Sequence, residues 1–257
     1  DHFRAQAHFY RESRDFLKGA GIVYQNTAPR YQTLKLSLTE VPEPHPHQRE
    51  SLDAWEQHGR RGVVVLPTGS GKSLVAQLAT ARVARSTLVV APTIDLMNQW
   101  YELLSQSFGI EVGLLGGGYH ELADITVSTY DSAYMHMERY GNRFGLLVYD
   151  EVHHLPGEMY SHSAEMSIAP YRLGLTATPE RADGRHVLLD TLVGPIVYEK
   201  GIRELSGEYL AEYRVERRSV QMVAEERVAY EAAHGEYRAF LQEKNIRMGS
   251  ANGWRRF

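Results

Sequence analysis

The segment Leu66-Pro-Thr-Gly-Ser-Gly-Lys-Ser73 limits the possible folds of this chain more than any other feature. It follows the apolar run at residues 62–66 and opens a helix-like stretch at residues 72–84. A strand, a glycine-rich turn and a helix in this order form a loop whose backbone N–H groups turn inward around phosphate oxygens. We therefore expect a strand–loop–helix unit that binds the phosphates of a nucleotide.

The residues of this loop suit different parts of the task. The Lys72 ammonium can reach the terminal phosphates, and the Ser73 hydroxyl can ligate Mg²⁺. A glycine-rich turn that binds nothing is the alternative, and the flanking strand and helix disfavour it. The strict pattern has a glycine where Leu66 stands, and the loop by itself does not specify a reaction. The expected nucleotide-binding residues of the loop are Thr68, Gly69, Ser70, Gly71, Lys72 and Ser73.

Four further apolar runs alternate with amphipathic segments of helix length, such as residues 95–107. Strands that are apolar almost throughout are typical of sheets covered on both faces. Strand–helix alternation predicts an α/β fold, with a parallel sheet and helices on both of its faces. The four runs are residues 87–91, 124–128, 145–149 and 172–176.

Two carboxylates, Asp150 and Glu151, follow one of these runs. In a parallel sheet they would lie at the carboxyl edge, where ligands bind. Asp150 is suited to hold Mg²⁺, and Glu151 to orient and activate an attacking water. A plain polar loop is the alternative, but the phosphate loop upstream favours the functional interpretation. A kinase would not need an adjacent glutamate, so hydrolysis is favoured. We expect Lys72, Asp150 and Glu151 to be catalytic, with Ser73 and Asp150 as metal ligands.

The composition of the 257-residue chain narrows the classes of chemistry further. It contains no cysteine, which excludes disulfides, thiolate zinc sites, iron–sulfur clusters and a cysteine nucleophile. It shows neither the roughly 18–20 consecutive apolar residues of a membrane span nor a basic-then-apolar leader, so we expect an intracellular protein that does not enter a membrane. The net charge of −4 excludes a basic coat over the whole surface but allows a local basic face.

The two ends of the chain read differently from its middle. Residues 1–19 carry apolar side chains at helical spacing and predict an amphipathic helix. Residues 41–47 hold three prolines, so we expect a linker there rather than a regular helix or central strand. Residues 213–220 are compatible with an extended crossover, and residues 225–248 are charge-rich with apolar residues near helical spacing.

The ordered motifs resemble those of superfamily-two helicases and translocases. Pro67-Thr68 before the loop glycines is typical of helicase phosphate loops. The full set is Gln48, the loop Thr68–Ser73, Ala91-Pro-Thr93, Ser128-Thr-Tyr130, Asp150-Glu-Val-His153 and Thr176-Ala-Thr178. Finer features resemble the XPB family of DNA-repair helicases. They are Val127-Ser-Thr-Tyr-Asp-Ser-Ala-Tyr134, Asp150-Glu-Val-His-His-Leu-Pro156 and Ile168-Ala-Pro-Tyr-Arg-Leu-Gly-Leu-Thr-Ala-Thr-Pro-Glu-Arg181 followed by Asp183-Gly-Arg185.

The resemblance implies roles for residues outside the loop. Gln48 would read the adenine edge, although the arginine that usually precedes it is not evident and His45 stands nearby. Other residues would hold the nucleic-acid backbone without reading its sequence, and a third group would couple the two sites. The expected nucleic-acid contacts are Pro92, Thr93, Ser128 and Thr129, and the expected coupling residues are His153, Thr176, Thr178, Arg181 and Asp183.

Three smaller features bear on how the chain would handle nucleic acid. The family's Arg-Glu-Asp tripeptide, linked to strand separation, corresponds here to Arg181-Ala-Asp183, which lacks the central acid. We therefore expect translocation, and robust duplex unwinding is in doubt. Gly116-Gly-Gly118 is either a site of close backbone approach or a flexible loop. Tyr130 and Trp100 are the better candidates for base stacking, with core packing favoured for Trp100.

The resemblance also implies a domain plan. Residues 48–210 would form the first RecA-like lobe, a parallel sheet with helices on both faces and with partial appendages at both ends. Residues 1–40 would be the remnant of an N-terminal damage-recognition domain, and residues 41–47 a proline-rich linker. Residues 211–257 would be a crossover and the start of a thumb-like helical insertion. The second lobe, with its arginine finger, would lie outside this chain.

The function implied by the resemblance is that of a DNA-dependent ATPase and 3′-to-5′ helicase or translocase. It would use Mg²⁺ and ATP, act on single-stranded or forked DNA, and work beside a repair nuclease. Because the arginine finger lies elsewhere, we expect this chain alone to hydrolyse ATP poorly. The alternatives are a nucleotide-gated binding or docking platform with weak motor activity, an RNA helicase, and the translocase of a nuclease-coupled restriction system.

Overall fold

The computed structural model of the chain describes residues 4–39, 41–180, 183–207, 209–211, 216 and 218–244. Residue contacts divide the chain into two compact units, Asp1–Ala211 and Glu212–Phe257. The described part of the second unit holds α9 (Ala224–Glu243), which begins one residue before the predicted charge-rich segment and covers most of it. Residues 245–248 of that segment, and residues 213–215 and 217 of the predicted crossover, lie outside the described residues.

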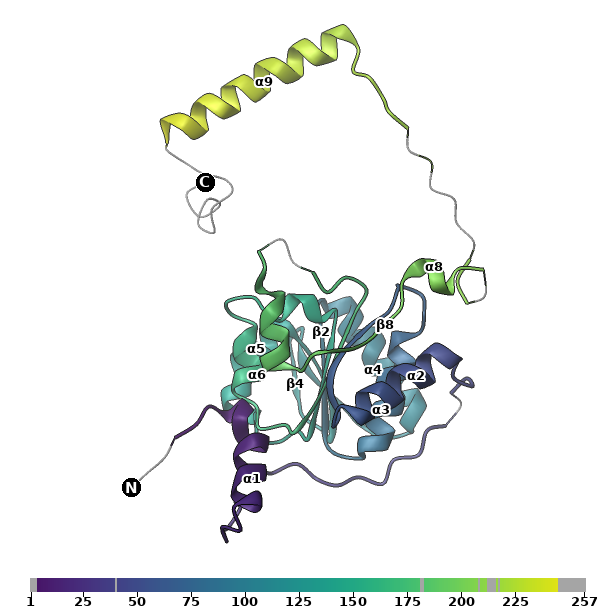
Figure 1. Cartoon of the computed structure of the whole chain (residues 1–257), viewed down its shortest axis with the longest axis vertical. Helices are drawn as coiled ribbons and strands as arrows, with labels where there is room; N and C mark the ends of the chain where they lie inside the picture. Colours follow the sequence, from purple (N-terminus) through teal and green to yellow (C-terminus); the bar gives the residue numbers. More distant parts are fainter. Residues whose placement is uncertain are drawn as a thin grey trace. The chain divides into compact units, whose positions relative to one another are not determined.

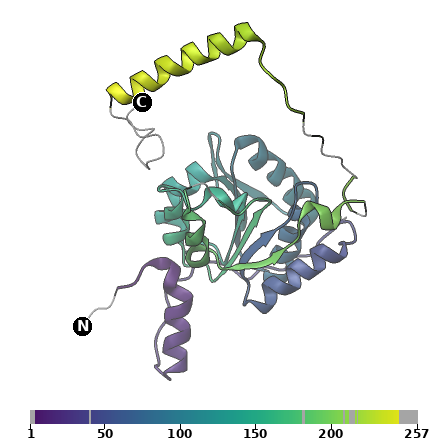
Figure 2. The same cartoon turned by 45° about the horizontal axis from the view of Figure 1, so that its top comes forward.

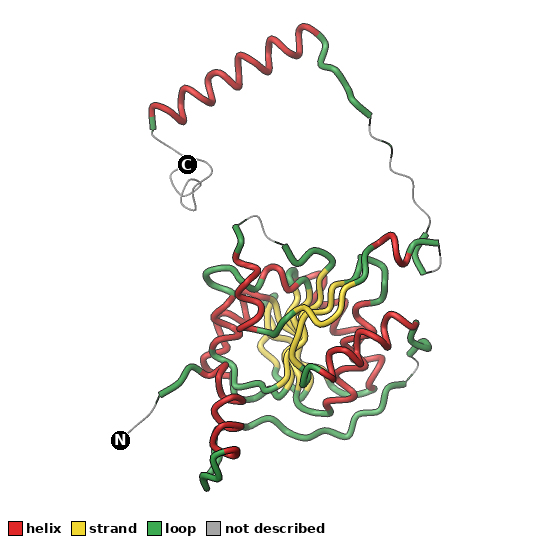
Figure 3. The backbone as a smooth tube through the Cα atoms, viewed as in Figure 1, coloured by secondary structure: helices red, strands yellow, loops and turns green. Residues whose placement is uncertain are grey.

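The first unit is built on one eight-stranded sheet, with helices on either side of it (Figure 1, Figure 3). The strand order is β4-β3-β5-β2-β6-β7-β1-β8, and every neighbouring pair is parallel except β3 with β4. This confirms the predicted α/β class. The strands are β1 (Arg61–Val65), β2 (Thr87–Ala91), β3 (Val112–Gly116), β4 (Tyr119–Glu121), β5 (Ile125–Thr129), β6 (Leu146–Asp150), β7 (Tyr171–Thr176) and β8 (Ile196–Glu199).

Helices cover both faces of the sheet (Figure 1, Figure 2). One face packs against α2 (Pro46–Gln57), α3 (Lys72–Val83) and α4 (Ile94–Phe108), and the other against α5 (Tyr130–Tyr140), α6 (Ser161–Glu165) and α7 (Leu189–Leu192). The remaining helical segments are η1 (Ala7–Phe9), α1 (Tyr10–Gly19), η2 (Val152–His154), η3 (Arg185–Leu188) and α8 (Ile202–Leu205). Among the described residues, none of the helices combines the length and the apolar character that crossing a membrane requires.

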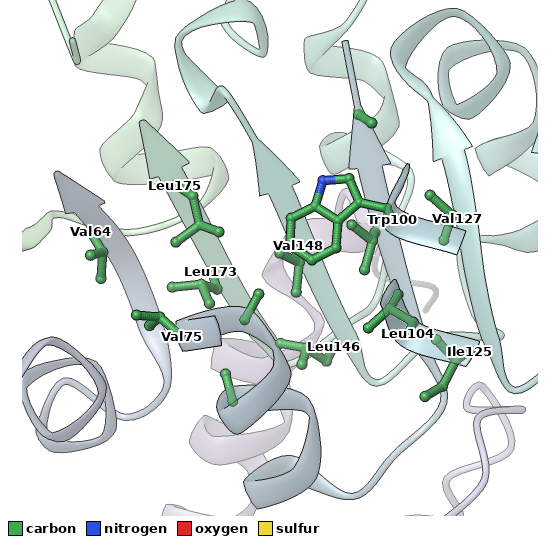
Figure 4. Packing of buried hydrophobic residues seen from close by; sticks show 14 of the residues in the cluster. Val64, Val75, Trp100, Leu104, Ile125, Val127, Leu146, Val148, Leu173 and Leu175 are labelled. Atoms are coloured by element: carbon green, nitrogen blue, oxygen red, sulfur yellow. The ribbon is translucent and has the colours of Figure 1, made fainter. Parts of the chain in front are cut away.

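Alternation along the strands explains why the predicted runs are apolar throughout. Val64 packs into the core on the α3 side, whereas Val63 and Val65 pack into the core on the α5 side. Successive side chains of a strand point to opposite faces, so a strand covered on both faces needs an apolar residue at every position. Figure 4 shows the core on the α3 side, where residues of β1, β5, β6 and β7 meet α3 and α4.

All five predicted strands are present, and three strands went unpredicted. The short β4 is exposed along its whole length and pairs antiparallel with β3 through the Gly116–Gly118 turn. β8 is a partly exposed edge strand of four residues. β4 and β8 lack the continuous apolar run by which the other strands were recognised, because one of their faces or edges meets water. The third unpredicted strand, β3, is buried along its whole length, but glycine occupies two of its five positions and interrupts the apolar run.

The N-terminal segment lies beside the amino ends of the strands. Its predicted helix is present as η1 followed by α1, which ends at Gly19 as expected, while residues 1–3 lie outside the described part. The Arg11 guanidinium donates hydrogen bonds to the carbonyls of Gly59 and Pro170, which precede β1 and β7. α1 therefore sits at the edge opposite to the phosphate loop.

The predicted proline-rich linker is two residues too long. α2 begins at Pro46, so Pro46 and His47 belong to a helix. Proline is accepted at the first helical position because the N–H that it lacks would have no partner there. The Gln48 side-chain oxygen accepts a hydrogen bond of 2.8 Å from the His45 N–H and completes the cap. Gln48 therefore sits in the first turn of a helix rather than after a loop.

Candidate nucleotide-binding and nucleic-acid sites

A pocket of about 450 Å³ opens at the carboxyl edge of the sheet, between the loop after β1 and the residues that end β6. It brings together the two parts of the site that the sequence places far apart. Of the expected nucleotide-binding set, Ser70 and Gln48 do not line this pocket. Its lining residues are Thr68, Gly69, Gly71, Lys72, Ser73, Leu96, Gln99, Trp100, Leu103, Asp150 and Glu151.

Backbone conformation and internal hydrogen bonds shape the phosphate loop. Gly69 and Gly71 have φ angles of 85° and 80°, in the left-handed region that favours glycine. The Ser70 hydroxyl is buried and donates a 2.7 Å hydrogen bond to the Pro67 carbonyl. The Lys72 ammonium lies in the pocket and donates to the Leu66 carbonyl at 3.2 Å. Ser70 thus stabilises the turn, while Lys72 is placed to meet a bound phosphate.

Two side chains from the first turn of α2 contact the backbone of the phosphate loop. Gln48 Nε2 donates to the Ser70 carbonyl at 2.8 Å, and His47 Nε2 lies 2.9 Å from the same oxygen. A Cβ atom on Gly71 would overlap Gln48 Nε2, so the contact is tight. Gln48 is 3% exposed and borders a second pocket of about 320 Å³, together with His45 and Ser73. Each of its polar groups has one hydrogen bond and keeps capacity for a second.

The Asp150 carboxylate is held by two donors. Trp100 Nε1 donates to Oδ2 at 2.8 Å, and the Glu151 N–H donates to Oδ1 at 3.1 Å. Burial raises the pKa of Asp150, and the hydrogen bond from Trp100 opposes that rise. The indole is 5% exposed, so the favoured prediction of core packing for Trp100 is confirmed. Its bond to Asp150 was not predicted, although a buried indole N–H usually finds a partner.

Tyr130 corrects the prediction of base stacking. Its ring is 2% exposed, and its hydroxyl donates to the backbone carbonyl of Asp150 at 2.9 Å. Burial raises the pKa of Tyr130 well above its usual value, so the phenol stays protonated and keeps donating. Tyr130 therefore supports the end of β6, the strand that carries Asp150, and its ring is not available to stack on a base.

The chemistry of the donors in the pocket fits Mg²⁺. The ion prefers oxygen ligands and is usually held by one or two carboxylates with phosphate oxygens and water. The Asp150 carboxylate and the residue Ser73 both line the pocket, and the Lys72 ammonium lies between the loop carbonyls and this space. The residues present therefore suit an Mg²⁺-nucleotide.

A hydrogen-bonded network joins Glu151 to the end of β7. Thr176 Oγ1 lies 3.3 Å from Glu151 Oε2 and 2.9 Å from His153 Nδ1, and it accepts a bond of 3.1 Å from the Thr178 N–H. Glu151 has a φ of 46°, a strained conformation for a residue other than glycine. The structure thus brings two of the five expected coupling residues, Thr176 and His153, against the expected water-activating carboxylate, and a third, Thr178, joins them through its bond to Thr176.

The other two expected coupling residues lie elsewhere. Arg181 is outside the described residues, as is Ala182. Asp183 is described, and its Oδ1 accepts a hydrogen bond of 3.1 Å from the Arg185 N–H at the start of η3.

The hydroxyls of Ser128 and Thr129 correct the expected contacts to nucleic acid. Ser128 is fully buried and donates to the Leu115 carbonyl at 2.8 Å. Thr129 is 7% exposed, and its Oγ1 accepts from the Ser132 N–H at 3.2 Å as the N-cap of α5. The Ser128 hydroxyl thus joins β5 to β3, and the Thr129 hydroxyl caps the first turn of α5. Both hydroxyls therefore point into the protein.

Three segments nevertheless meet at this edge. Exposed Thr93 caps α4 by accepting a hydrogen bond of 3.2 Å from the Leu96 N–H, and Pro92 precedes it. The Gly116–Gly118 turn packs against the starts of α4 and α5. A Cβ on Gly116 would lie 2.9 Å from Ser132 Oγ, and one on Gly117 would lie 3.2 Å from Ile94 Cγ2. The absence of side chains at Gly116 and Gly117 therefore lets the turn pack closely against both helices.

Comparison with known proteins places this geometry in a family. The family described as "Type III restriction enzyme, res subunit" (ResIII) matches residues 42–181. The chain is 45% identical to the "DNA 3′-5′ translocase XPB2" of Sulfurisphaera tokodaii, over 82% of this chain and 48% of that protein. It is 34% identical to the "DNA 3′-5′ helicase XPB" of Mycobacterium tuberculosis, over 75% of this chain and 37% of that protein.

Solved structures add evidence on the fold alone. The UvsW helicase from bacteriophage T4 matches with a TM-score of 0.50 at 17% identity, over 75% of this chain and 78% of that chain. A hypothetical ATP-dependent RNA helicase from Sulfolobus tokodaii matches with a TM-score of 0.53 at 20% identity, over 63% of this chain and 54% of that chain. The chain spans about half the length, or less, of the curated relatives it matches. It belongs to the ResIII family and, within that family, to the XPB type.

Proposed function

We propose that this chain is the ATP-binding lobe of an XPB-type motor, which couples hydrolysis of Mg²⁺-ATP to 3′-to-5′ movement along DNA. One observation carries the proposal. A single pocket joins the phosphate loop to Asp150 and Glu151, and Glu151 lies in a network with Thr176 and His153. Relatives named as DNA 3′-5′ translocases and helicases support the direction and the substrate.

The residues of the pocket divide the chemistry among them. The loop N–H groups and the Lys72 ammonium bind the phosphates, and Ser73 with Asp150 would hold Mg²⁺. The ion, when bound, neutralises charge on the phosphates. Glu151 orients the attacking water and accepts its proton. Gln48 would contact the adenine through the hydrogen-bonding capacity that its contact with the loop leaves unused.

The nucleic-acid surface consists of Pro92, Thr93, the Gly116–Gly118 turn and the first turns of α4 and α5. Backbone N–H groups at helix starts suit phosphate oxygens, so this surface would hold the strand without reading its sequence. The hydroxyls of Ser128 and Thr129 support it from inside. Thr176 and Thr178, with His153, would transmit changes at the nucleotide to this edge.

The domain plan and the wider setting are part of the same proposal. Residues 48–210 form the first motor lobe, residues 1–40 belong to an N-terminal damage-recognition domain, and residues 211–257 lead into a thumb-like insertion. The protein acts inside the cell on single-stranded or forked DNA, beside a repair nuclease. A nucleotide-gated docking platform is the second candidate, because Ala182 replaces the acid linked to strand separation.

The test is a DNA-stimulated ATPase assay on the complete protein, comparing wild type with Lys72→Ala. We expect DNA to stimulate hydrolysis in wild type, and the variant to lose that hydrolysis. Lys35→Ala, an exposed lysine away from the pocket, is the matched control and should behave like wild type. Hydrolysis that survives in Lys72→Ala would rule out the motor. Stimulation by RNA but not by DNA would assign an RNA helicase, since the backbone contacts do not distinguish the sugars.

A further inference from the structure

Trp100 is the unexpected member of the nucleotide pocket. It lies in the second turn of α4, in the middle of the core on the α3 side (Figure 4). Figure 4 shows the indole ring beside Val148, with its nitrogen toward the arrowheads that mark the carboxyl ends of the strands. From there Nε1 donates to Asp150 Oδ2 at 2.8 Å, and the residue itself lines the pocket. Its packing and its hydrogen bond therefore serve different purposes.

Trp55 provides a comparison within the same core. It is fully buried, and its Nε1 also donates at 2.8 Å, but the acceptor is the backbone carbonyl of Arg172. A backbone carbonyl is fixed by its strand, so that bond satisfies a buried donor and orients nothing. The acceptor of Trp100 is a side-chain carboxylate, whose terminal torsion has broad preferences and needs an external constraint.

We propose that Trp100 is a positioning residue, which fixes the orientation of the Asp150 carboxylate toward Mg²⁺ through its indole N–H. The inference rests on the proposed function, because it concerns the metal of the same site. One carboxylate oxygen is bound by Trp100 and the other by the Glu151 N–H, so rotation of the carboxylate would break both bonds. Lone pairs remain on both oxygens for a metal or its water.

The rest of α4 explains why a tryptophan can perform this task. The indole is 5% exposed and lies beside Val148 within the apolar core, so the donor is held in place and cannot follow a carboxylate that turns away. Groups that hydrogen-bond a metal ligand from behind set its orientation, and their loss costs about 10–100-fold in metal affinity or activity. Phenylalanine keeps most of the ring volume and removes the donor.

The experiment measures how nucleotide binding by the 257-residue chain depends on Mg²⁺, with a fluorescent ADP analogue as the probe. In Trp100→Phe we expect the Mg²⁺ concentration for half-maximal tightening to rise about 10–100-fold. Binding of the analogue in EDTA should weaken much less than binding in Mg²⁺, because the phosphate loop is untouched. Trp55→Phe, the matched control, should keep wild-type behaviour in both measurements.

Two results separate this inference from the proposed function. If Trp100→Phe keeps the wild-type Mg²⁺ dependence, Trp100 only fills the core and the inference is overturned, while the function stands. If wild type itself shows no Mg²⁺-dependent binding of nucleotide, the proposed function and this inference both fall. A loss in Trp55→Phe equal to that in Trp100→Phe would also overturn the specific role, because it would reflect core damage.

A second measurement does not depend on how well Trp100→Phe folds. The chain has three tryptophans, so Trp55→Phe and Trp254→Phe together assign the Trp100 indole N–H resonance by elimination. In wild type labelled with ¹⁵N-tryptophan, that resonance should shift when Mg²⁺ and ADP bind. The Trp55 indole resonance should stay in place. In Asp150→Asn the Trp100 resonance should move as the charged acceptor is lost. A Trp100 resonance that ignores both changes would overturn the inference.

Discussion

Gly71 determines both the backbone conformation of the phosphate loop and the close contact of that loop with α2. Its φ of 80° disfavours any side chain, and a Cβ would overlap the Gln48 amide that fastens the loop. Gly71→Ala should therefore displace the loop and weaken nucleotide binding at least tenfold. Strain of this kind costs about 1–3 kcal/mol, and tenfold in affinity corresponds to about 1.4 kcal/mol.

Gly118→Ala is the control for that prediction. Gly118 has a φ of 93°, but a Cβ there meets nothing within 4 Å. The control therefore carries the backbone strain without the overlap, and it should bind nucleotide like wild type in a titration with a fluorescent analogue. Equal losses of affinity in both variants would show that the contact between Gly71 and Gln48 has no part in binding.

Glu151 should affect hydrolysis without affecting binding. The carboxylate is partly buried and lies 3.3 Å from the Thr176 hydroxyl, a contact that the amide of Glu151→Gln can keep. Removing a general base typically costs about 10²–10⁴-fold in rate. We expect single-turnover hydrolysis to fall by that factor, with nucleotide affinity unchanged within about twofold. A variant that hydrolyses at the wild-type rate would remove Glu151 from the catalytic set.

At the scale of elements, α4 links the two proposed sites, because Thr93 caps it at the proposed nucleic-acid edge and Trp100 reaches Asp150 from its second turn. Thr93→Ala removes the capping oxygen and should lower the free energy of unfolding by about 1 kcal/mol. Urea denaturation measures the change. Thr93→Ser, which keeps the oxygen, should restore it, and a Ser variant as unstable as Ala would show that the cap is not the cause.

The N-terminal element should respond to pH through His8. The His8 ring is 6% exposed, and burial, with the Arg172 charge nearby, lowers its pKa from 6.5. The detached segment therefore binds a proton more readily than the docked one. Its docking is at full strength above pH 6.5 and weakens as the pH falls through the lowered value. After correction for the intrinsic effect of pH, the protection of α1 against native-state hydrogen exchange should therefore fall as the pH is lowered from 7.5 to 5.5.

His8→Asn is the control for the pH prediction, since it has no group that titrates in this range. Its α1 exchange, corrected for the intrinsic effect of pH, should change less than that of wild type. A wild-type profile as flat as that of His8→Asn would mean that protonation of His8 does not control docking of the segment.

The elements also show what the sequence could reveal and what it could not. The five strands with continuous apolar runs and the strand–loop–helix unit were predictable, because burial on both faces favours such runs. β4 and β8 were not, since edge strands carry a weaker pattern, and the buried β3 was not, because Gly113 and Gly116 interrupt its apolar run. At the site, the motifs located Asp150, Ser128 and Thr129. The motifs do not show that the Thr129 hydroxyl faces inward or that the Trp100 indole meets Asp150. Both features depend on packing between segments that are distant in the sequence.

For the whole molecule, the main question is how nucleotide binding by this chain relates to the rate at which ATP is hydrolysed. The chain spans about half the length of the XPB2 relative, and the proposed arginine finger belongs to a second lobe. Such a finger is worth about 10³–10⁵ in rate. The loop, Asp150 and Glu151 are all present in this chain, so binding and slow hydrolysis should be separable from fast, DNA-stimulated hydrolysis.

The most direct test of the central claim is the binding and turnover of Mg²⁺-ATP by the purified 257-residue chain, beside Lys72→Ala. We predict saturable binding that Lys72→Ala weakens about 10–100-fold, since a hydrogen bond to a charged group is worth about 1.5–3 kcal/mol. We predict turnover of wild type below about 1 s⁻¹, given the loss that a missing finger causes. Binding that is absent, or unchanged in Lys72→Ala, would contradict the assignment of the nucleotide site, and turnover well above that rate would contradict the division into two lobes.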